Sequence, residues 1–363
     1  MESIIPRKPN AQGAGNIKAM RHVLPVFLLM LLLLLGVVQG HVPLLPSPGI
    51  QPDAAVQIED ANKSWAAYAL LPQGAIHYYR FDREAGQRIH LEIITSPQDP
   101  AFAPGFVLMG AGLPKGVALR PDIVVPEGYG AVLVNGSVPD DAVYEPFAPS
   151  AYRKLGGLDM QAPQAGEYLV AVFAPSVGNY GLVVGFEEAF TLEEWILLPL
   201  RLISVYRWEG QSLPAVFAPI LAVLVAGYYF LNRRRPDLSQ PRALASLAGL
   251  LFLGSCASIL YQMTYALTRS SGGEEAYITA IFAAISATIG AAALYLALRG
   301  RDREFSVREK VGLRIVGVLA LLAGSGLLIG PLLTIISTAG GRSRAADKPA
   351  DGKARKPKGL RGQ

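Results

Sequence analysis

Apolar and polar positions follow two different periods along the chain. From about residue 54 to residue 187, short stretches of alternating apolar and polar residues are separated by turns rich in Pro and Gly, with no long helical period. Residues 88–93, RIHLEI, show this alternation. Further strands are expected at residues 65–71, 76–81, 106–109, 130–134, 168–173 and 180–186. Short strands at this spacing predict an all-β sandwich or jelly roll over residues 41–190.

Four long apolar segments follow the predicted sandwich and change the expected fold class. They cover residues 213–232, 243–266, 276–298 and 311–338. Each is long enough to cross ~30 Å of hydrocarbon as a helix that rises ~1.5 Å per residue. The chain is therefore predicted to be a multidomain membrane protein, in which an all-α bundle of four transmembrane helices, within residues 212–340, follows the sandwich.

A shorter helix is predicted over residues 191–211, between these two parts. Thr191 and Glu194 form a capping box at its start, and apolar residues follow at helical spacing. Trp195 and Trp208 suit an amphipathic helix that lies in the membrane interface, with both indoles among the lipid headgroups. Packing of the same apolar face against the sandwich is the alternative.

The first 40 residues have the layout of an export signal. A basic stretch over residues 2–22 precedes an uncharged apolar run over residues 23–38, and the small residue at position 40 suits cleavage of a signal peptide. An uncleaved signal anchor is the alternative, because the apolar run is nearly long enough to cross a membrane. Both interpretations place residues 41–190 outside the cytoplasm, on a multi-pass protein of the cell membrane.

The composition and the charge distribution support a membrane location. Hydrophobic residues make up 51% of the chain, the mean hydropathy is +0.33 and the net charge is +5. Residues 41–190 carry 16 acidic and 8 basic side chains, a local charge of −8. The basic excess elsewhere flanks the apolar segments, which indicates membrane topology rather than a nucleic-acid partner.

The basic tail, residues 341–363, conflicts with four crossings. The arginines at 233–235 and the basic residues between the third and fourth segments suit the cytoplasmic side. Four crossings after an external sandwich would leave the tail outside. The last segment is re-entrant, or the basic tail is exported, or one span is miscounted; four true spans are the favoured interpretation. The tail itself is predicted to be disordered.

Two stretches resemble the bacterial pre-peptidase C-terminal domain. IEDANKSWAAYALLPQGAIHYYRFDREAGQRIHLEI has the S-x-x-x-Y stretch, Y-x-F strand and Gly turn with which this family opens, and GEYLVAVFAPSVGNYGLVVGF is similar to its closing strands. The resemblance lies within residues 54–187. It implies a small β-sandwich that accompanies other modules in secreted proteins and has structural rather than catalytic motifs. Residues 95–165 depart from the family pattern, as an insertion or as part of a larger sandwich.

Three of the histidines raise the question of a metal site. Strand alternation places His77 toward the core and His90 toward solvent, on opposite faces. A zinc site needs three or four converging ligands, so we expect no metal and no cofactor, and both histidines are interpreted as sandwich residues. A remote alternative is a copper-dependent surface enzyme. If cleavage follows Gly40, His41 could bind copper through its free amine and its ring, together with His77 or His90.

The predicted membrane segments lack the residues of most intramembrane chemistry. No histidine follows His90, and no Asp or Glu lies within the four segments. Haem ligation, a serine–histidine protease and a proton path are therefore not supported. Cys256 is the single cysteine, so no disulfide can form within the chain. Small residues such as Ser286 and Gly290 allow close helix contacts within the chain or in a homo-oligomer.

These features favour a non-enzymatic surface protein whose sandwich binds a partner or ligand through exposed loops. The candidate binding residues are aromatic and acidic residues of the expected loops: Tyr129, Tyr144, Glu145, Phe147 and Tyr152. The expected partners are the lipid bilayer and a protein or surface polymer. Sequons at Asn62 and Asn135 predict a glycoprotein. The alternative function is that of an accessory subunit in a larger membrane complex that supplies the chemistry.

Overall fold

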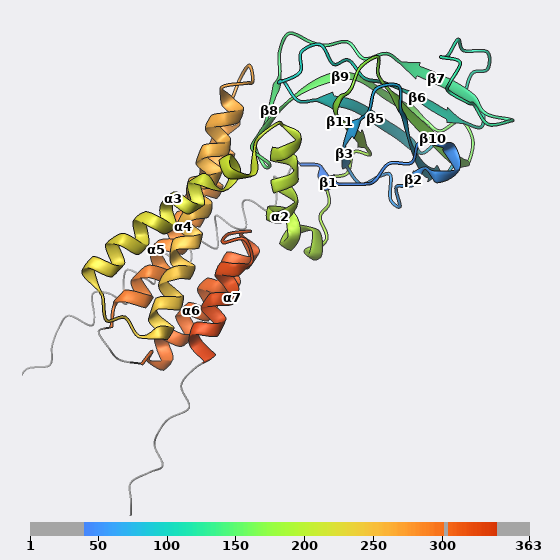
Figure 1. Cartoon of the computed structure of the whole chain (residues 1–363). Coiled ribbons are helices and arrows are strands. Elements are labelled where there is room, and N and C mark those ends of the chain that lie inside the picture. Colours follow the sequence, from blue (N-terminus) through green and yellow to red (C-terminus); the bar gives the residue numbers. More distant parts are fainter. Residues whose placement is uncertain (1–39, 301–303, 340–363) are drawn as a thin grey trace, which may run out of the picture.

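The chain folds into a β-rich part followed by a helical part (Figure 1). The computed structural model describes residues 40–300 and 304–339. The predicted signal segment, apart from Gly40, and the predicted basic tail lie outside the described residues. The two parts follow each other along the chain in the order that the hydrophobic pattern predicts.

Two sheets form the β-rich part. The first has six strands in the order β1 (Val42–Leu44), β3 (Trp65–Leu71), β11 (Gly178–Val184), β5 (Arg88–Thr95), β9 (Ser150–Gln161) and β8 (Val143–Glu145). The second has five strands in the order β2 (Val56–Gln57), β4 (Ile76–Arg83), β10 (Gly166–Phe173), β6 (Gly105–Gly110) and β7 (Gly130–Val134), and a short 3-10 helix, η1 (Pro52–Ala54), precedes β2. The pairing is antiparallel except between β1 and β3 and between β2 and β4.

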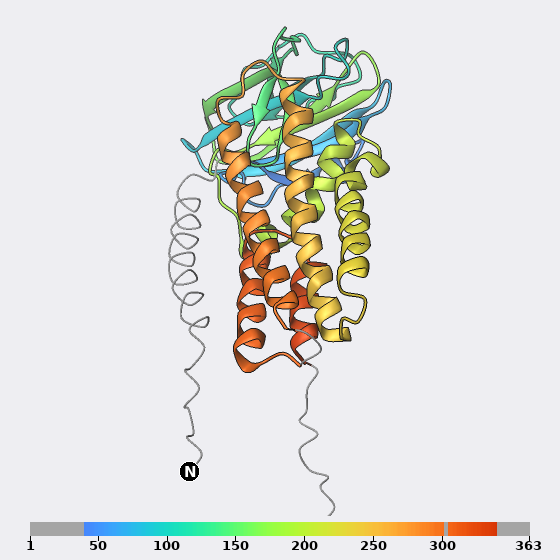
Figure 2. The same ribbon diagram turned by 90° about the vertical axis from the view of Figure 1, so that its left-hand side faces the viewer.

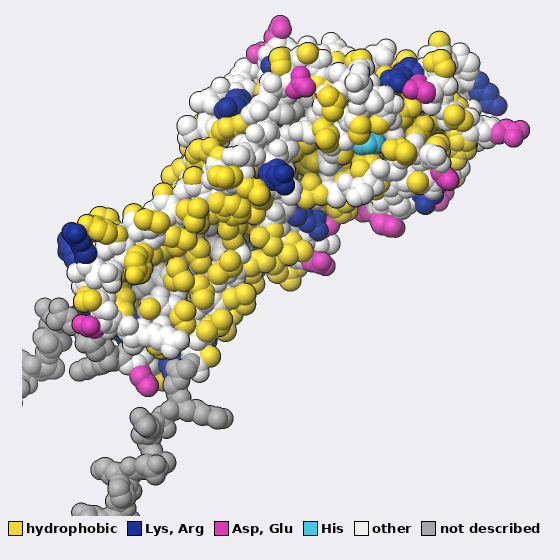
Figure 3. Space-filling model, viewed as in Figure 1, with side chains coloured by type: hydrophobic (Ala, Val, Ile, Leu, Met, Phe, Trp, Pro, Cys, Tyr) yellow, Lys and Arg dark blue, Asp and Glu magenta, His cyan; other side chains and the backbone are white. Residues whose placement is uncertain are grey.

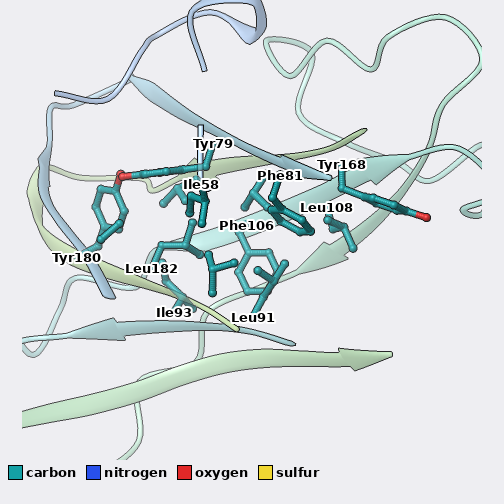
Figure 4. Close-up of a cluster of buried hydrophobic side chains, with 14 of the residues drawn as sticks. Ile58, Tyr79, Phe81, Leu91, Ile93, Phe106, Leu108, Tyr168, Tyr180 and Leu182 are labelled. Atoms are coloured by element: carbon teal, nitrogen blue, oxygen red, sulfur yellow. The ribbon is translucent and has the colours of Figure 1, made fainter. Parts of the chain in front are cut away.

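Side chains that alternate along the strands fill the space between the two sheets. Ile89, Leu91 and Ile93 project from one sheet, and Tyr79 and Phe81 project from the other; all five belong to one buried cluster (Figure 4). Alternation with a period of two places every second side chain on the core face. The seven predicted strands are all present, with bounds shifted by up to two residues.

Among the α-helices of residues 40–300 and 304–339, three are long and apolar enough to cross a membrane, namely α3 (Leu213–Arg234), α4 (Gln240–Leu267) and α5 (Ala276–Leu298). They run side by side beneath the sandwich (Figure 2). The close spacing depends on small residues: a Cβ atom on Gly290 of α5 would lie 2.8 Å from Leu253 Cγ of α4. The small residues noted in the sequence therefore provide helix contacts within the chain.

The helix predicted between the two parts is α2 (Leu192–Trp208). The predicted capping box is confirmed: Thr191 Oγ1 accepts a hydrogen bond from the Glu194 N–H, and the Glu194 carboxylate accepts one from the Thr191 N–H. Trp208 does not lie among lipid headgroups as predicted, because its indole is buried against the six-stranded sheet and donates to the Tyr180 carbonyl oxygen at 2.9 Å. This end of α2 packs on the sandwich.

The fourth predicted transmembrane helix, residues 311–338, is wrong as a single span. It is two shorter helices, α6 (Val307–Leu322) and α7 (Ile329–Ala339), which pack against each other. Arg314 Nε donates to Thr338 Oγ1 at 3.1 Å, so the start of α6 lies beside the end of α7. The pair is a helical hairpin whose tip points toward α2 and whose two ends lie at the end of the bundle away from the sandwich (Figures 1 and 2).

The hairpin tip reverses the chain because of its glycines and its hydrogen bonds. Gly324 and Gly326 have φ of 62° and 82°, which favours glycine, and the two leucines that follow, Leu327 and Leu328, also have positive φ. The Gly326 N–H donates to Ser255 Oγ of α4 at 2.8 Å, so a backbone group freed by the turn finds a partner. The tip lies near the middle of α4, and neither helix is long enough to cross a membrane alone.

Arg242 holds the other end of the bundle together. Its side chain is buried at the start of α4, and Nη1 donates to the Ala297 carbonyl oxygen at 2.8 Å, at the end of α5. The guanidinium also lies 4.5 Å from the Phe305 ring centroid and pairs with Glu309 of α6 at 3.5 Å. A cation is favourable at the carboxyl end of a helix, so this contact joins three helices at low electrostatic cost.

Paired cysteines test the hairpin directly. Thr334 Cβ lies 3.3 Å from the position of a Cβ atom on Gly317, close to the ~3.8 Å of a disulfide. In a Cys256→Ala background, Gly317→Cys with Thr334→Cys should form a disulfide on oxidation in membranes, measured as protection of both thiols from a maleimide-polyethylene glycol. One continuous helix would hold the two positions ~25 Å apart and leave both thiols reactive, as in the two single-cysteine controls.

Candidate functional site

The sandwich is docked on the helices through the β8–β9 hairpin. The Tyr144 hydroxyl lies 2.6 Å from Thr279 Oγ1 of α5, and Thr279 Oγ1 donates to the Pro146 carbonyl oxygen at 2.6 Å. Tyr144 and Ala151 form a buried cluster with Ala266 of α4. The strand pair therefore enters the helical part and is fixed there by both apolar and polar contacts.

A buried carboxyl group completes this docking. Glu209, directly after α2, is 2% exposed, and its Oε1 accepts a hydrogen bond from the Ala151 N–H at 2.8 Å. Gln211 Nε2 lies 3.3 Å from the other carboxyl oxygen and also donates to Gln262 Oε1 of α4 at 2.7 Å. Burial raises the pKa of Glu209 to about 7, against the opposing effect of these hydrogen bonds.

Helix α2 lies between the sandwich and the bundle (Figure 1). Lys63, just before β3, pairs with Glu194 in the first turn of α2. Trp195 Nε1 donates to the Leu322 carbonyl oxygen at 2.7 Å, at the end of α6. At its other end, the Trp208 ring packs edge-on against Tyr68, 4.9 Å between centroids. Both ends of α2 therefore have fixed contacts.

An apolar cavity of about 130 Å³ lies where α2 meets the bundle. Its walls come from α2, from the first halves of α3 and α5, from the middle of α4, from the tip of the α6–α7 hairpin and from the β8–β9 turn. The lining is mostly Phe, Leu, Ile and Pro, and it includes Ser255, Ser258 and Thr279. The surrounding face of the helices is rich in hydrophobic side chains (Figure 3). A cavity of this composition suits an aliphatic group.

A second, smaller cavity of about 20 Å³ adjoins the first and is more polar. Phe147, Phe190 and Leu198 line both cavities. The polar side chains at the small cavity are His41, Tyr68, Glu145, Ser150 and Tyr152. The two cavities together form the junction site, which has an apolar end among the helices and a polar end beneath the six-stranded sheet.

The polar end of the junction site has unused hydrogen-bonding capacity. Within the described residues, no lysine, arginine or histidine pairs with Glu145, whose Oε1 accepts a hydrogen bond from the Phe147 N–H at 3.2 Å. The hydroxyls of Tyr68 and Tyr152 have no hydrogen-bond partner in the same ranges. Burial raises the pKa of Glu145 to about 8, with the nearby carboxylates of Glu188 and Glu275 acting in the same direction and hydrogen bonds from the Phe147 and Ala148 N–H groups opposing them.

His41 contributes a neutral ring to this end. Its Nδ1 lies 2.7 Å from Ser64 Oγ, and burial lowers its pKa. The imidazole is therefore uncharged at neutral pH. The described residues that line the polar end include one acidic group, Glu145, and no lysine or arginine.

Four of the five candidate binding residues of the sequence meet at this junction. Glu145, Phe147 and Tyr152 line the junction site, and Tyr144 lies directly beside it on β8. Tyr129 is far from them in the fold. It packs against the cluster on the outer face of the five-stranded sheet, so the structure does not bring it to the other four.

The two strand histidines lie on opposite faces, as predicted. His77 is buried, and its Nδ1 lies 2.9 Å from the Tyr180 hydroxyl. His90 faces outward, where Nε2 lies 3.1 Å from Glu92 Oε1. Within residues 40–300 and 304–339, no group of three or more His, Cys, Asp or Glu side chains is arranged to hold a metal ion.

The two sequons differ in accessibility. Asn135 is exposed after β7, whereas Asn62 is half-buried and its Oδ1 accepts a hydrogen bond from Arg83 at 2.7 Å. Of the two asparagines, Asn135 is the one whose side chain is open to modification.

Sequence reasoning missed several residues of the junction site. Tyr68 and Leu198 were assigned only to a strand and a helix, and Glu209 was not singled out. One signal was present, because Glu209 and Gln211 are polar residues between two apolar helices and therefore need buried partners once those helices pack.

No protein-family model matches the chain. Among solved structures, part of the chain is similar to MopE, a secreted protein of Methylococcus capsulatus in which an oxidized tryptophan facilitates copper binding. The identity is 11%, the match covers 33% of this chain and 71% of that chain, and the TM-score is 0.15. A similarity at this level supports no conclusion about fold or function.

The raised pKa of Glu209 predicts a pH-dependent junction. The folded chain keeps a proton that the unfolded chain loses above about pH 4.5, so stability is greatest below that pH and falls as the pH rises through about 7. The loss is on the order of 2–3 kcal/mol, or roughly 5 °C in Tm. Thermal unfolding of the protein in mild detergent, followed by tryptophan fluorescence at several pH values between 5 and 8, measures this change in Tm.

Two variants serve as controls. Glu209→Gln should flatten this slope, with the remainder due to Glu145, whereas Glu84→Gln on an exposed loop should leave it unchanged. A Tm that is independent of pH in the natural chain would contradict a buried, protonated Glu209.

Proposed function

We propose that the chain is a membrane-anchored binding protein, not an enzyme, which takes its ligand at the junction site. The observation that carries this proposal is that the two cavities are adjacent and share lining residues: an apolar end among the helices lies beside a polar end that contains Glu145, which has no ion-pair partner in the described part of the chain, and two tyrosine hydroxyls. Ligand sites are typically concave and apolar, with a few converging polar groups. The sandwich resembles the bacterial pre-peptidase C-terminal domain, whose motifs are structural rather than catalytic. This resemblance agrees with a binding role rather than an enzymatic one.

The proposed topology has the sandwich outside the cytoplasm and three crossings by α3, α4 and α5. The α6–α7 hairpin then enters the membrane from the cytoplasmic side and returns to it. The basic residues support this arrangement, because Arg233 and Arg299 lie at the end of the bundle away from the sandwich, and Ala339 lies at that same end. The basic tail would then start on the cytoplasmic side, which removes the conflict that four crossings create.

Single cysteines in a Cys256→Ala background test the topology. Asp140 and Glu274 are exposed near the sandwich, and Asp237 is exposed in the α3–α4 loop. A membrane-impermeant maleimide applied to intact cells should label Asp140→Cys and Glu274→Cys and should leave Asp237→Cys unlabelled until the cells are lysed. Labelling in the reverse pattern would refute the external sandwich.

A photoreactive residue tests the binding function. p-Benzoyl-phenylalanine at Phe147, which lines both cavities, should capture a bound molecule on irradiation of native membranes, measured as a defined mass increase of the purified chain. The same residue at Leu70, exposed on the sandwich, is the control. An adduct yield at Phe147 no higher than at Leu70 would refute ligand binding at the junction.

A further inference from the structure

We infer that the ligand of the junction site is a membrane amphiphile, with an aliphatic chain in the apolar cavity and a compact primary-ammonium head at the polar end. This inference rests on the proposed function and adds the chemical class of the ligand. The position of the apolar cavity, the volumes of both cavities and the acidic group at the polar end support it.

The position of the apolar cavity indicates that its occupant enters from the membrane. Ile220 of α3, Ser258 of α4 and Phe282 of α5 line it, and all three belong to helices long and apolar enough to cross a membrane. What surrounds this level of the bundle is therefore lipid hydrocarbon. An aliphatic chain can enter from there without crossing water, and a water-soluble ligand cannot.

The size of the apolar cavity fits part of one chain. Its volume of about 130 Å³ is close to the ~150 Å³ of an engineered apolar cavity that stays dry and takes up benzene. An apolar cavity without an occupant forgoes dispersion contacts along its walls, so uptake of several methylene groups is favourable. Three of the lining residues carry hydroxyl groups, and the rest of the lining is mostly apolar.

The residues at the polar end favour a cationic head group. Glu145 has no cationic partner among the described residues, and the acidic side chain of Glu188 is close enough to affect it. The carboxyl group of Glu145 is mostly protonated at neutral pH before a ligand binds. An anionic head would disfavour ionisation of this group and gain no ion pair, whereas an ammonium group would favour the ionised form and pair with it. The free hydroxyls of Tyr68 and Tyr152 and the neutral His41 ring can accept its remaining hydrogen bonds.

The volume of the polar end limits the size of the head. About 20 Å³ holds roughly one water-sized group. A primary ammonium group is of that size, and a trimethylammonium group is not. Since phosphatidylethanolamine and phosphatidylcholine differ only in these methyl groups, the site should distinguish two lipids of equal net charge.

Photoreactive lipids test the inference. The full-length chain in nanodiscs receives phosphatidylethanolamine, phosphatidylcholine or phosphatidylglycerol, each with the same diazirine-bearing chain. Phosphatidylethanolamine should label peptides of α2 and α4 at least fivefold more than either other lipid. Ser258→Phe, which fills the apolar cavity, should abolish the excess, and Leu260→Phe, on the exposed face of the same helix, should leave it unchanged.

The polar end is tested separately. Glu145→Gln and the double variant Tyr68→Phe with Tyr152→Phe should each bring phosphatidylethanolamine labelling down to the level of phosphatidylcholine, without lowering the Tm enough to unfold the chain. Equal labelling by all three lipids, or an excess that survives Ser258→Phe, would overturn the inference.

Failure of the inference can be distinguished from failure of the proposed function. If the photoreactive residue at Phe147 captures a protein or a water-soluble molecule, the junction binds a ligand but the ligand is not a lipid. If that residue captures nothing and the lipids label without selectivity, both are refuted.

Discussion

The hydrogen bond from the Ala151 N–H to the buried carboxyl group of Glu209 fixes the sandwich on the helices. A buried backbone donor without a partner is costly, so the β8–β9 hairpin can enter the helical part only where an acceptor meets it. Glu209 provides that acceptor because it follows α2 directly, and Gln211 and Gln262 bind each other and hold the neighbouring segments in place. Breaking this set would leave several buried polar groups unpaired at once.

The junction site exists because the helices around it have unequal lengths. The α6–α7 hairpin ends near the middle of α4, where Gly326 bonds to Ser255, and α2 closes the space above the tip only in part. A fourth full-length helix would have filled this space with side chains. The α6–α7 hairpin and the apolar cavity are therefore two consequences of one feature, the glycine-containing turn at Gly324 and Gly326.

The sequence predicts much of this fold and only part of the site. Alternation reveals the strands with strong patterns. Strand β9 starts with two buried residues and alternates regularly only after Leu155, beside a register shift against β5, so its twelve residues show no single period. Hydropathy locates α3, α4 and α5. It cannot separate α6 from α7, because Leu327 and Leu328 continue the apolar run through the turn that their backbone helps to make.

The candidate site was predictable in its β8–β9 part alone. Tyr144, Glu145, Phe147 and Tyr152 are aromatic and acidic residues clustered in one predicted loop, which is where binding residues tend to lie. Other residues of the junction site lie on α2 and β3, far away in sequence. The local sequence pattern does not predict that these elements meet the β8–β9 turn. Tyr129 shows the limit of the same reasoning, because a loop tyrosine that covers an apolar cluster has the same sequence signature as one that binds a ligand.

A structure of the chain in lipid nanodiscs, determined by cryo-electron microscopy with a bound antibody fragment, would show both the docking of the sandwich and the occupant of the junction site. We expect one fixed orientation of the sandwich and continuous elongated density from Ser258 at the apolar cavity to the carboxyl group of Glu145. A sandwich that adopts several orientations, or a junction site closed by side chains, would contradict this expectation.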